Sequence, residues 1–226
     1  MNKRKLILFY LKLNLKELEN RVRGGENLFT EFKHKINFPE KIAREIVAFS
    51  NTQGGWLLIG VDDNKLISGI KNIEEEVFEF NKIITKLIKF SIEYTAFQIP
   101  ISEKKTVLAL QIKESKQKPN FAFEKIGDKT GIAYVRVADK SVQASSVVIK
   151  ILELQTINKE VRIKFGDIES KTMQIIQKNG FVSVKSLVET LLISNQTATE
   201  SLINMVLGGI LKIIPEEGKE DKFYEI

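Results

Sequence analysis

One segment of the chain, PEKIAREIVAFSNTQGGWLLIGVDD at residues 39–63, places a helix, a turn and a strand directly after one another. Pro39 suits the first position of a helix, because its missing N–H would have no partner there in any case. Gly54-Gly55 supply a turn that few other residues can adopt. The apolar run over 56–61 is short enough for a buried strand, and Asp62-Asp63 turn the chain again after it. We therefore predict a helix, a Gly-Gly turn and a core strand that ends in two carboxylates.

Two other stretches belong to one pattern with AFSNTQGGWLLIGVDD and the Gly69 that follows it. They are ENLFTEFK at residues 26–33 and AYVRVADKS at residues 133–141. The three blocks, in this order, resemble the Schlafen-type, divergent AlbA-like domain of bacterial proteins. The first block is similar to the opening E-x4-E-F-K of that family, and the last to its late Y-x-R-x-G strand and turn. Ala138 stands where the family pattern usually has glycine, so we expect the turn after Val137 to be built differently. The resemblance covers residues 15–155.

The composition excludes several kinds of site. With 226 residues the chain can form one or two domains, and its hydrophobic content of 43% is that of a globular protein with a core. The absence of cysteine excludes a disulfide framework and a thiolate metal site. The single histidine, His34, excludes a site with two histidine ligands and disfavours a Ser/His catalytic triad. Catalysis would therefore depend on carboxylates, lysines or a bound metal.

The net charge of +6 is unevenly distributed along the chain. Residues 1–24 carry seven Lys/Arg and two Glu, whereas residues 167–226 carry six Lys and nine Asp/Glu. A basic N-terminal arm is suited to follow a phosphate backbone. The alternative is a solvated basic face that keeps the protein in solution.

The N-terminus superficially resembles a signal peptide, with the sequence KRKLILF at residues 3–9. Lys12 and Lys16 interrupt the apolar run, and no small-residue cleavage site follows. No segment reaches the roughly 20 apolar residues that a membrane span requires. We expect a cytoplasmic protein without a membrane partner.

Hydrophobic spacing predicts alternating helices and strands up to residue 155. Leucines at helical spacing from Leu8 to Leu18 predict a helix within residues 5–22, although the alternation over 6–13 also fits a strand. Glu31-Phe32-Lys33 predicts an edge strand. The other predicted elements are a helix at 73–90, strands at 92–101, 106–112, 121–126 and 133–137, and a closing helix at 141–155. We therefore predict an α+β fold with an AlbA-like mixed sheet and packed helices.

The pattern changes after residue 155. Helices are predicted at 168–178, 185–192 and 194–207, a short strand at 181–184, and a hairpin formed by 210–215 and 222–226. This order resembles a small winged helix-turn-helix domain. We accordingly divide the chain into a basic arm at 1–24, an AlbA-like domain at 25–155, a linker at 156–166 and a winged-helix-like domain at 167–226.

The resemblance also implies a candidate catalytic site. Eukaryotic Schlafen cores that resemble this pattern cleave RNA with two glutamates five residues apart and an aspartate after the central strand. The matching positions are Glu26, Glu31 and either Asp62 or Asp63, which would hold Mg²⁺ or Mn²⁺ and stabilise charge on a scissile phosphate. The alternative is that both glutamates are solvated and that Asp62-Asp63 only stabilise a turn.

Candidate nucleic-acid contacts lie in both predicted domains. Asn195, Gln196 and Thr199 lie in the first turns of the would-be recognition helix. The sequence EEGKED in the predicted wing would repel phosphate, which favours dimerisation or packing as the alternative role of this domain. The candidates in the AlbA-like domain are Lys33, Asn51, Thr52, Arg136 and Lys140.

These observations predict a nucleic-acid-binding protein, a bacterial transcriptional regulator, with DNA or RNA as partner and a homodimer as a candidate assembly. One alternative is a metal-dependent RNase that uses the carboxylates, and another is an assembly module without catalysis. Regulation requires no cofactor, whereas the RNase would require Mg²⁺ or Mn²⁺. ATP binding has no support, because the loop at 51–55 lacks the Lys-Ser/Thr of a P-loop.

Overall fold

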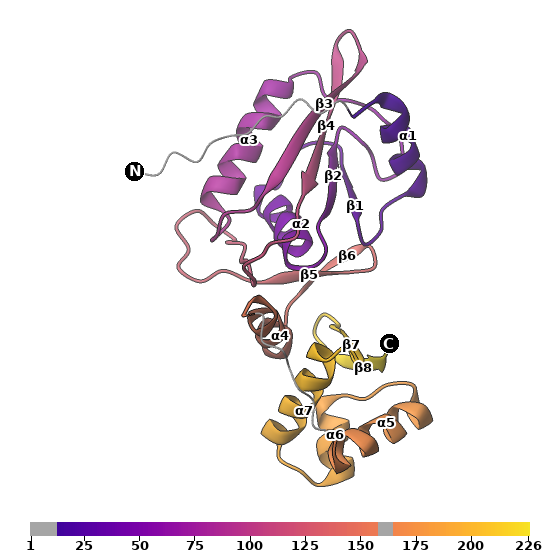
Figure 1. Ribbon diagram of the computed structural model, residues 1–226. Coiled ribbons are helices and arrows are strands. Elements are labelled where there is room, and N and C mark those ends of the chain that lie inside the picture. Colours follow the sequence, from indigo (N-terminus) through magenta and orange to yellow (C-terminus); the bar gives the residue numbers. More distant parts are fainter. Residues whose placement is uncertain (1–12, 158–164) are drawn as a thin grey trace. The chain divides into compact units, whose positions relative to one another are not determined.

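The computed structural model describes residues 13–157 and 165–226 (Figure 1). By its internal contacts the chain divides into two compact units, which we describe separately. The first unit extends to Ser115 and resumes from Asn120 to Ser141, and the second contains Lys116–Pro119 and Val142–Ile226. No helix in the described part of the chain is long and apolar enough to cross a membrane.

The first unit is built on a four-stranded mixed sheet, as the sequence predicts. Its strand order is β1-β2-β4-β3, which places β1 at one edge. β1 pairs with β2 in parallel, and the other two pairings are antiparallel. The strands are β1 (Thr30–Lys33), β2 (Gly55–Ile59), β3 (Tyr94–Ser102) and β4 (Lys105–Ile112).

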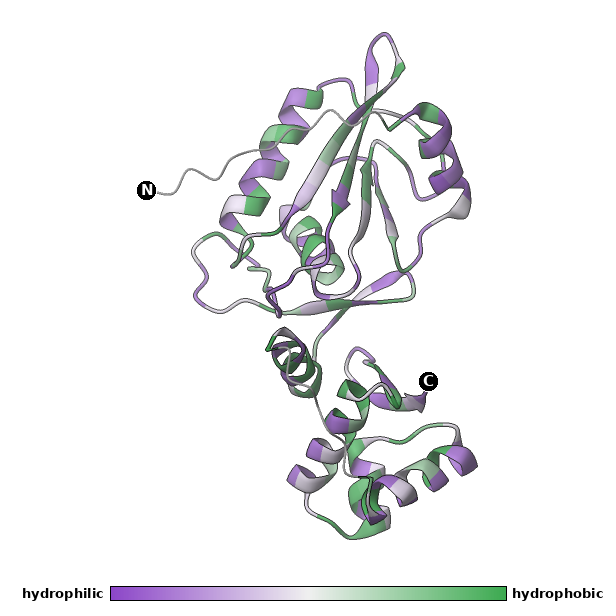
Figure 2. Cartoon of the chain, in the orientation of Figure 1, coloured by the Kyte–Doolittle hydropathy of each residue, from purple (hydrophilic) through white to green (hydrophobic). Residues whose placement is uncertain are grey.

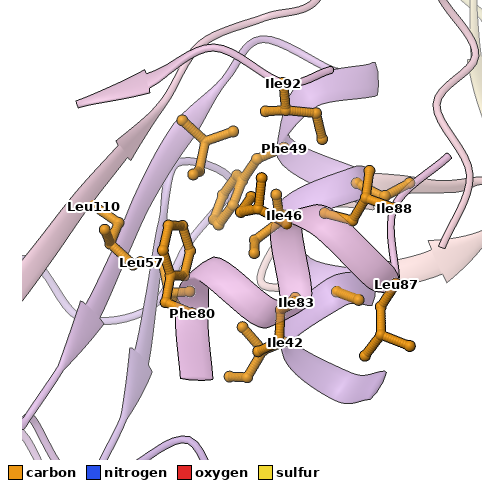
Figure 3. Close-up of a cluster of buried hydrophobic side chains, with 14 of the residues drawn as sticks. Ile42, Ile46, Phe49, Leu57, Phe80, Ile83, Leu87, Ile88, Ile92 and Leu110 are labelled. Atoms are coloured by element: carbon orange, nitrogen blue, oxygen red, sulfur yellow. The ribbon is translucent and has the colours of Figure 1, made fainter. Parts of the chain in front are cut away.

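Both faces of the central strand β2 are buried. Leu57 and Ile59 belong to a core cluster that also contains residues of α2 (Pro39–Asn51) and α3 (Ile73–Lys86), as Figure 3 shows. Trp56 and Leu58 belong to a second cluster on the opposite face of the sheet. Because successive strand residues point to opposite faces, a strand covered on both sides must be apolar at every position. This burial explains the unbroken apolar run that the sequence shows.

The second face of the sheet is covered by α1 (Leu15–Gly24), whose Leu18 and Val22 are buried against it. The Asn14 side chain caps this helix, and Glu17 completes a capping box. Leu18 is buried as the predicted helical stripe requires, but Leu15 is 41% exposed, and Leu8 and Leu11 lie outside the described residues. Hydrophobic and hydrophilic residues alternate along the helices (Figure 2), as expected for helices with one face on a core.

The Gly-Gly turn between α2 and β2 is a place of close approach. Gly54 has φ +74°, and a Cβ there would lie 2.6 Å from the carbonyl oxygen of Ile112. A Cβ on Gly55 would lie 2.3 Å from the ring of Phe49. The two glycines therefore form the predicted turn and also allow close packing, because a side chain at either position would overlap a neighbour.

Two sequence predictions near the end of the first unit are wrong. Residues 121–126 do not form a strand, because only Ala122 pairs, with Ile88 and Ile132, and the following residues form an exposed loop. The predicted helix at 141–155 begins later, because Lys140–Gln143 forms strand β6 beside β5 (Tyr134–Val137).

The turn between β5 and β6 contains the alanine that departs from the family pattern. Ala138 adopts φ +54°, the left-handed conformation that glycine occupies without strain. The backbone geometry that the family pattern implies is thus kept with a less suitable residue.

The second unit packs its helices around one hydrophobic cluster that includes Leu187, Leu202, Met205 and Phe223. The backbone of Val182 exchanges two hydrogen bonds with Phe223, of 3.0 and 2.8 Å, where the sequence predicts a strand at 181–184. The elements are α4 (Ser146–Thr156), α5 (Asp167–Asn179), α6 (Val184–Leu191), α7 (Asn195–Leu207), β7 (Leu211–Ile214) and β8 (Lys222–Glu225).

Helix α4 belongs to the second unit by its contacts, whereas the sequence pattern predicts it at the end of the first domain. Its Val147 packs against the cluster of the second unit, and the Ser145 hydroxyl at its N-cap donates to Asp221. The boundary near residue 141 is therefore earlier than the predicted one at 155. Most of the predicted linker, residues 158–164, lies outside the described residues.

The close approach at Gly55 predicts a specific sensitivity to substitution. Gly55→Ala should destabilise the first unit by about 2 kcal/mol or more, because its methyl group would overlap the Phe49 ring. The matched control is Gly24→Ala, where a Cβ has no neighbour within 4 Å and should be neutral or stabilising by up to about 1 kcal/mol. Urea unfolding followed by circular dichroism measures both changes, and equal stability of the two variants would contradict the packing argument.

Candidate functional site

The edge strand β1 presents its charged residues to the side of the sheet that α2 covers. Phe32 is buried in the cluster beneath α1, so Glu31 and Lys33 point to the opposite face. Glu31 is only 7% exposed. A carboxylate this deeply buried needs charged or hydrogen-bonding partners.

Those partners come from β5, β6 and α2. Nη1 of Arg136 donates to Oε2 of Glu31 at 3.0 Å, to Oε2 of Glu45 at 2.7 Å and to Oγ of Ser141 at 3.1 Å. Its Nη2 donates to the carbonyl oxygen of Asn27 at 2.8 Å. We refer to Arg136, Glu31, Glu45 and Ser141 as the Arg136 cluster. It links four elements of the first unit through one guanidinium group.

The side chain of Arg136 is fully buried, with 0% of its surface exposed. It lies over the ring of Phe49, with the guanidinium carbon 4.6 Å from the ring centre. Arg136 was a candidate for phosphate contact, but its burial gives it a structural role. A guanidinium inside the protein does not reach a phosphate on the surface.

The charges in and around the cluster balance. Lys33 Nζ pairs with Oε1 of Glu31, so both oxygens of this carboxylate have cationic partners. Burial raises the pKa of Glu45, the neighbouring Glu31 adds to this effect, and Ser141 and Arg136 oppose it. Two cations and two carboxylates thus form a neutral group, which limits the cost of burying each charge.

The structure does not gather the predicted carboxylates into a metal site. Glu26 accepts the backbone N–H of Phe32 at 2.9 Å, and Asp62 pairs with Nδ1 of His34 at 2.5 Å. Partial loss of water raises the pKa of Glu26, the Phe32 N–H opposes this, and Glu31 and Asp63 add to the rise. Within residues 13–157 and 165–226, no three Asp, Glu or His side chains are arranged to hold a metal ion. The residues therefore do not fit Mg²⁺ or Mn²⁺, since cations already occupy both oxygens of Glu31.

Asn51 and Thr52, predicted to contact nucleic acid, are turned toward the protein instead. Nδ2 of Asn51 donates to the carbonyl oxygens of Asn120 at 3.0 Å and Tyr134 at 2.9 Å, and its Oδ1 accepts the Asn120 N–H at 2.7 Å. The hydroxyl of Thr52 accepts the backbone N–H of Arg136 at 2.9 Å. These two side chains fasten the loop after α2 to β5.

Basic side chains surround the Arg136 cluster at the surface. Arg44 on α2 donates to the carbonyl oxygen of Ser141, and Lys140 beside it is exposed. Lys33 pairs with Glu31 at the end of β1, and Lys35 two residues later is exposed. We refer to Lys33, Lys35, Arg44 and Lys140 as the basic rim.

In the second unit, the polar residues of α7 lie beside α4. Asn195, Gln196 and Thr199 line a pocket of about 470 Å³ together with Lys150 and Leu154 of α4. Gln196 also donates to Glu200 at 2.9 Å. The predicted reading face is therefore flanked by another helix and carries a carboxylate.

Sequence reasoning missed three residues with clear roles. Glu45 is one helical turn before the buried Phe49, and a charge at that spacing indicates a buried partner. His34 pairs with Asp62, and no local signal in the sequence reveals this contact. Arg21 stacks on Trp56, whereas the charge pattern identifies it only as one residue of the basic arm.

Comparison with known proteins gives a family match over most of the first unit. The model of the family described as Schlafen, AlbA_2 matches residues 26–145, more than half of the chain. A crystal structure of the DIP2311 protein from Corynebacterium diphtheriae aligns with 88% of this chain at 15% identity, with a TM-score of 0.43. The chain spans about a third of the length of that protein, since 34% of it is covered.

Removing the guanidinium from the Arg136 cluster should destabilise the protein strongly. Arg136→Met leaves Glu31 and Glu45 buried without their main cation, which costs about 3–5 kcal/mol. The exposed Arg23→Met is the control for loss of one positive charge. Urea unfolding near neutral pH should separate the two variants, and similar stabilities would mean that the cluster contributes little.

The raised pKa of Glu45 has a consequence for stability against pH. The folded protein binds the proton of this carboxyl more tightly than the unfolded chain, whose pKa is near 4.5. The contribution of Glu45 to the free energy of unfolding should therefore fall as the pH rises above that value. Glu45→Gln should remove this negative contribution to the slope, as measured by urea unfolding at several pH values. An unchanged slope would show that Glu45 titrates normally in the folded protein.

Proposed function

The chain belongs to the family described as Schlafen, AlbA_2, and from this we propose that it binds nucleic acid and acts as a bacterial transcriptional regulator. The observation that carries the proposal is the basic rim on the matched unit. Its cations come from separate elements and are held around one rigid, neutral cluster. Lysine and arginine at the surface of a rigid sheet edge are suited to bind successive phosphates.

The Arg136 cluster supports this function indirectly. It fixes β1, α2 and the β5–β6 hairpin to each other, and these elements carry Lys33, Arg44 and Lys140. Preorganised cations lose less conformational entropy on binding than cations on a flexible arm. The cluster itself is buried, and Arg136 together with Lys33 balances its two carboxylates, so phosphate binding rests on the other cations of the rim.

We also propose that the second unit is a winged helix-turn-helix domain. The order α5, the Val182 bridge, α6, α7 and the β7–β8 hairpin supports this assignment. In the hairpin, Glu216 pairs with Lys219 and Lys222, which leaves little positive charge for phosphate. We infer that this unit contributes less to affinity than the basic rim and serves association or regulation.

Charge reversal on the basic rim tests the function. Lys35→Glu with Lys140→Glu should weaken binding of a labelled duplex or RNA and lower its salt dependence by about 0.9 in log K for each phosphate that the variant no longer neutralises. The control is Lys86→Glu with Lys104→Glu, two exposed lysines elsewhere on the same unit. Fluorescence anisotropy across a salt series gives both quantities. Equal effects of the two pairs would remove the rim from the interface, and no binding by wild type at low salt would overturn the function.

A truncation that tests the basic arm must remove fewer residues than 1–24, the range that the charge pattern defines. Leu18 and Val22 are buried, so deleting residues 1–24 would remove part of the core. Deleting residues 2–12 removes four of the basic residues and keeps α1. If the arm contacts phosphate, this truncation should weaken binding and flatten its salt slope in the same anisotropy assay, while the unfolding curve stays unchanged. An unchanged salt slope would remove residues 2–12 from the interface.

The RNase alternative is tested with the same RNA. Because the carboxylates do not form a metal site, we expect RNA incubated with the protein and Mn²⁺ to remain intact on a denaturing gel. Cleavage that stops with EDTA and with a folded Glu31→Gln variant would instead support the nuclease. Circular dichroism of this variant is essential, because Glu31 also holds Arg136.

A further inference from the structure

A pocket of about 520 Å³ lies in the first unit where β2 begins, and it shares no lining residue with the basic rim. Its size is in the range of small-molecule sites in proteins. Its walls come from α1, the Gly54-Gly55 turn and the last residues of β4. Its lining includes Arg21, Phe29, Gln53, Trp56 and Gln111.

Arg21 stacked on the buried Trp56 forms one wall of the pocket. The guanidinium carbon of Arg21 lies 4.0 Å from the centre of the Trp56 ring, and Trp56 packs on Phe97 with 5.5 Å between ring centres. The ring of Phe29 is 44% exposed beside them. Arginine planes and aromatic rings are the surfaces on which proteins stack unpaired bases.

Three polar side chains of the pocket make no side-chain hydrogen bond within the described part of the chain. Nε of Arg21 is buried without a hydrogen-bond partner, and its guanidinium has no hydrogen bond or ion pair with any residue that the structure describes. The same holds, over residues 13–157 and 165–226, for the side-chain amides of Gln53 and Gln111. Gln111 faces Trp56 directly across the β2–β4 ladder, where the preceding residues on that face, Val107 and Ala109, are apolar. Gln111 thus places a polar side chain, without a hydrogen-bond partner among the described residues, where it is suited to a ligand.

The chemistry of the lining favours a base over an isolated phosphate. The charged residues around the pocket are Arg21, Lys113 and Glu114, a net charge of +1 from two cations and one anion. Lys113 also lies 3.5 Å from Glu93. Two amides and a guanidinium supply donors and acceptors that match the edge of a base, whereas a phosphate site would require a larger positive charge.

We propose that this pocket takes an unstacked base of single-stranded nucleic acid, with the base against Arg21 and Phe29 and its edge hydrogen-bonded by Gln53 and Gln111. The proposal rests on the proposed nucleic-acid binding and specifies its substrate, since a duplex does not offer a free base. The basic rim would hold backbone phosphates, and the pocket would distinguish single strands from duplexes.

Intrinsic fluorescence tests the pocket directly, because Trp56 is the only tryptophan of the chain. A single-stranded oligonucleotide should change the Trp56 emission in a saturable manner, and the duplex of the same sequence should change it much less. Arg21→Ala should weaken single-strand binding by about 5- to 150-fold, as expected for loss of one stacked base. Arg23→Ala removes the same charge from the same helix outside the pocket and should have a much smaller effect.

Gln111→Leu is the second variant, because Arg21→Ala also removes packing from Trp56. It should weaken single-strand binding while circular dichroism and urea unfolding stay as in wild type. Anisotropy with a labelled strand separates the two proposals. Binding without a change in Trp56 emission, or equal effects of Arg21→Ala and Arg23→Ala, would overturn the pocket and leave nucleic-acid binding intact. If no oligonucleotide binds, the proposed function fails, and titration with mononucleotides then decides the pocket: saturable quenching would uphold it and none would overturn it.

Discussion

A guanidinium group that is fully removed from water must be paired, and the first unit is arranged around the pairing of Arg136. Its partners lie far apart in the sequence, at Asn27 and Glu31 on one side and Glu45 on α2 on the other. The β5–β6 hairpin is thereby tied to both the edge strand and the helix. The stability of this arrangement depends on charge neutrality, because either carboxylate without the arginine would be a buried, uncompensated anion.

The same interaction explains why the polar atoms of Glu31, Asn51 and Thr52, which belong to the family-like blocks, contact other parts of the protein. Glu31 matches a family position, but both of its oxygens are paired with cations. Asn51 and Thr52 stand in the most recognisable loop, and their polar atoms fasten that loop to Tyr134 and Arg136. In this chain, the residues that carry the family resemblance mainly build the fold.

Much of the fold was predictable because it is encoded locally. The continuous apolar run of β2, the amphipathic period of α2 and the close packing at Gly54-Gly55 all follow from neighbouring residues, and the α+β class follows from them. The failures are elements that depend on distant partners. Residues 121–126 have a strand-like composition, yet only isolated bridges form there, from Ala122 to Ile88 and Ile132. Helix α4 looked like the end of the first domain because its contacts with the second unit leave no local trace in the sequence.

The candidate site was less predictable than the fold for a related reason. Lys33 and Lys140 were candidates through the family-like blocks that contain them, but the same blocks could not show that Arg136 is buried. Glu45 lies one helical turn from the buried Phe49, which is an unusual place for a charge. Its hydrogen bond with Arg136 explains this position. The pairing of His34 with Asp62 required the turn after β2 to fold back, and no period in the sequence indicates this.

Arg136 and Arg21 both lie against aromatic rings of the first unit, but their donors are used differently. Arg136 makes contacts with three anionic or hydroxyl groups and a carbonyl, so a ligand would have to break existing bonds to reach it. Arg21 is held in place by the Trp56 ring, yet its donors have no partner in the described part of the chain. A fixed orientation with unused donors is the state in which a ligand gains hydrogen bonds without a free-energy cost for rearranging the protein. The geometry at Arg21 therefore favours ligand binding at the pocket, whereas Arg136 serves the fold.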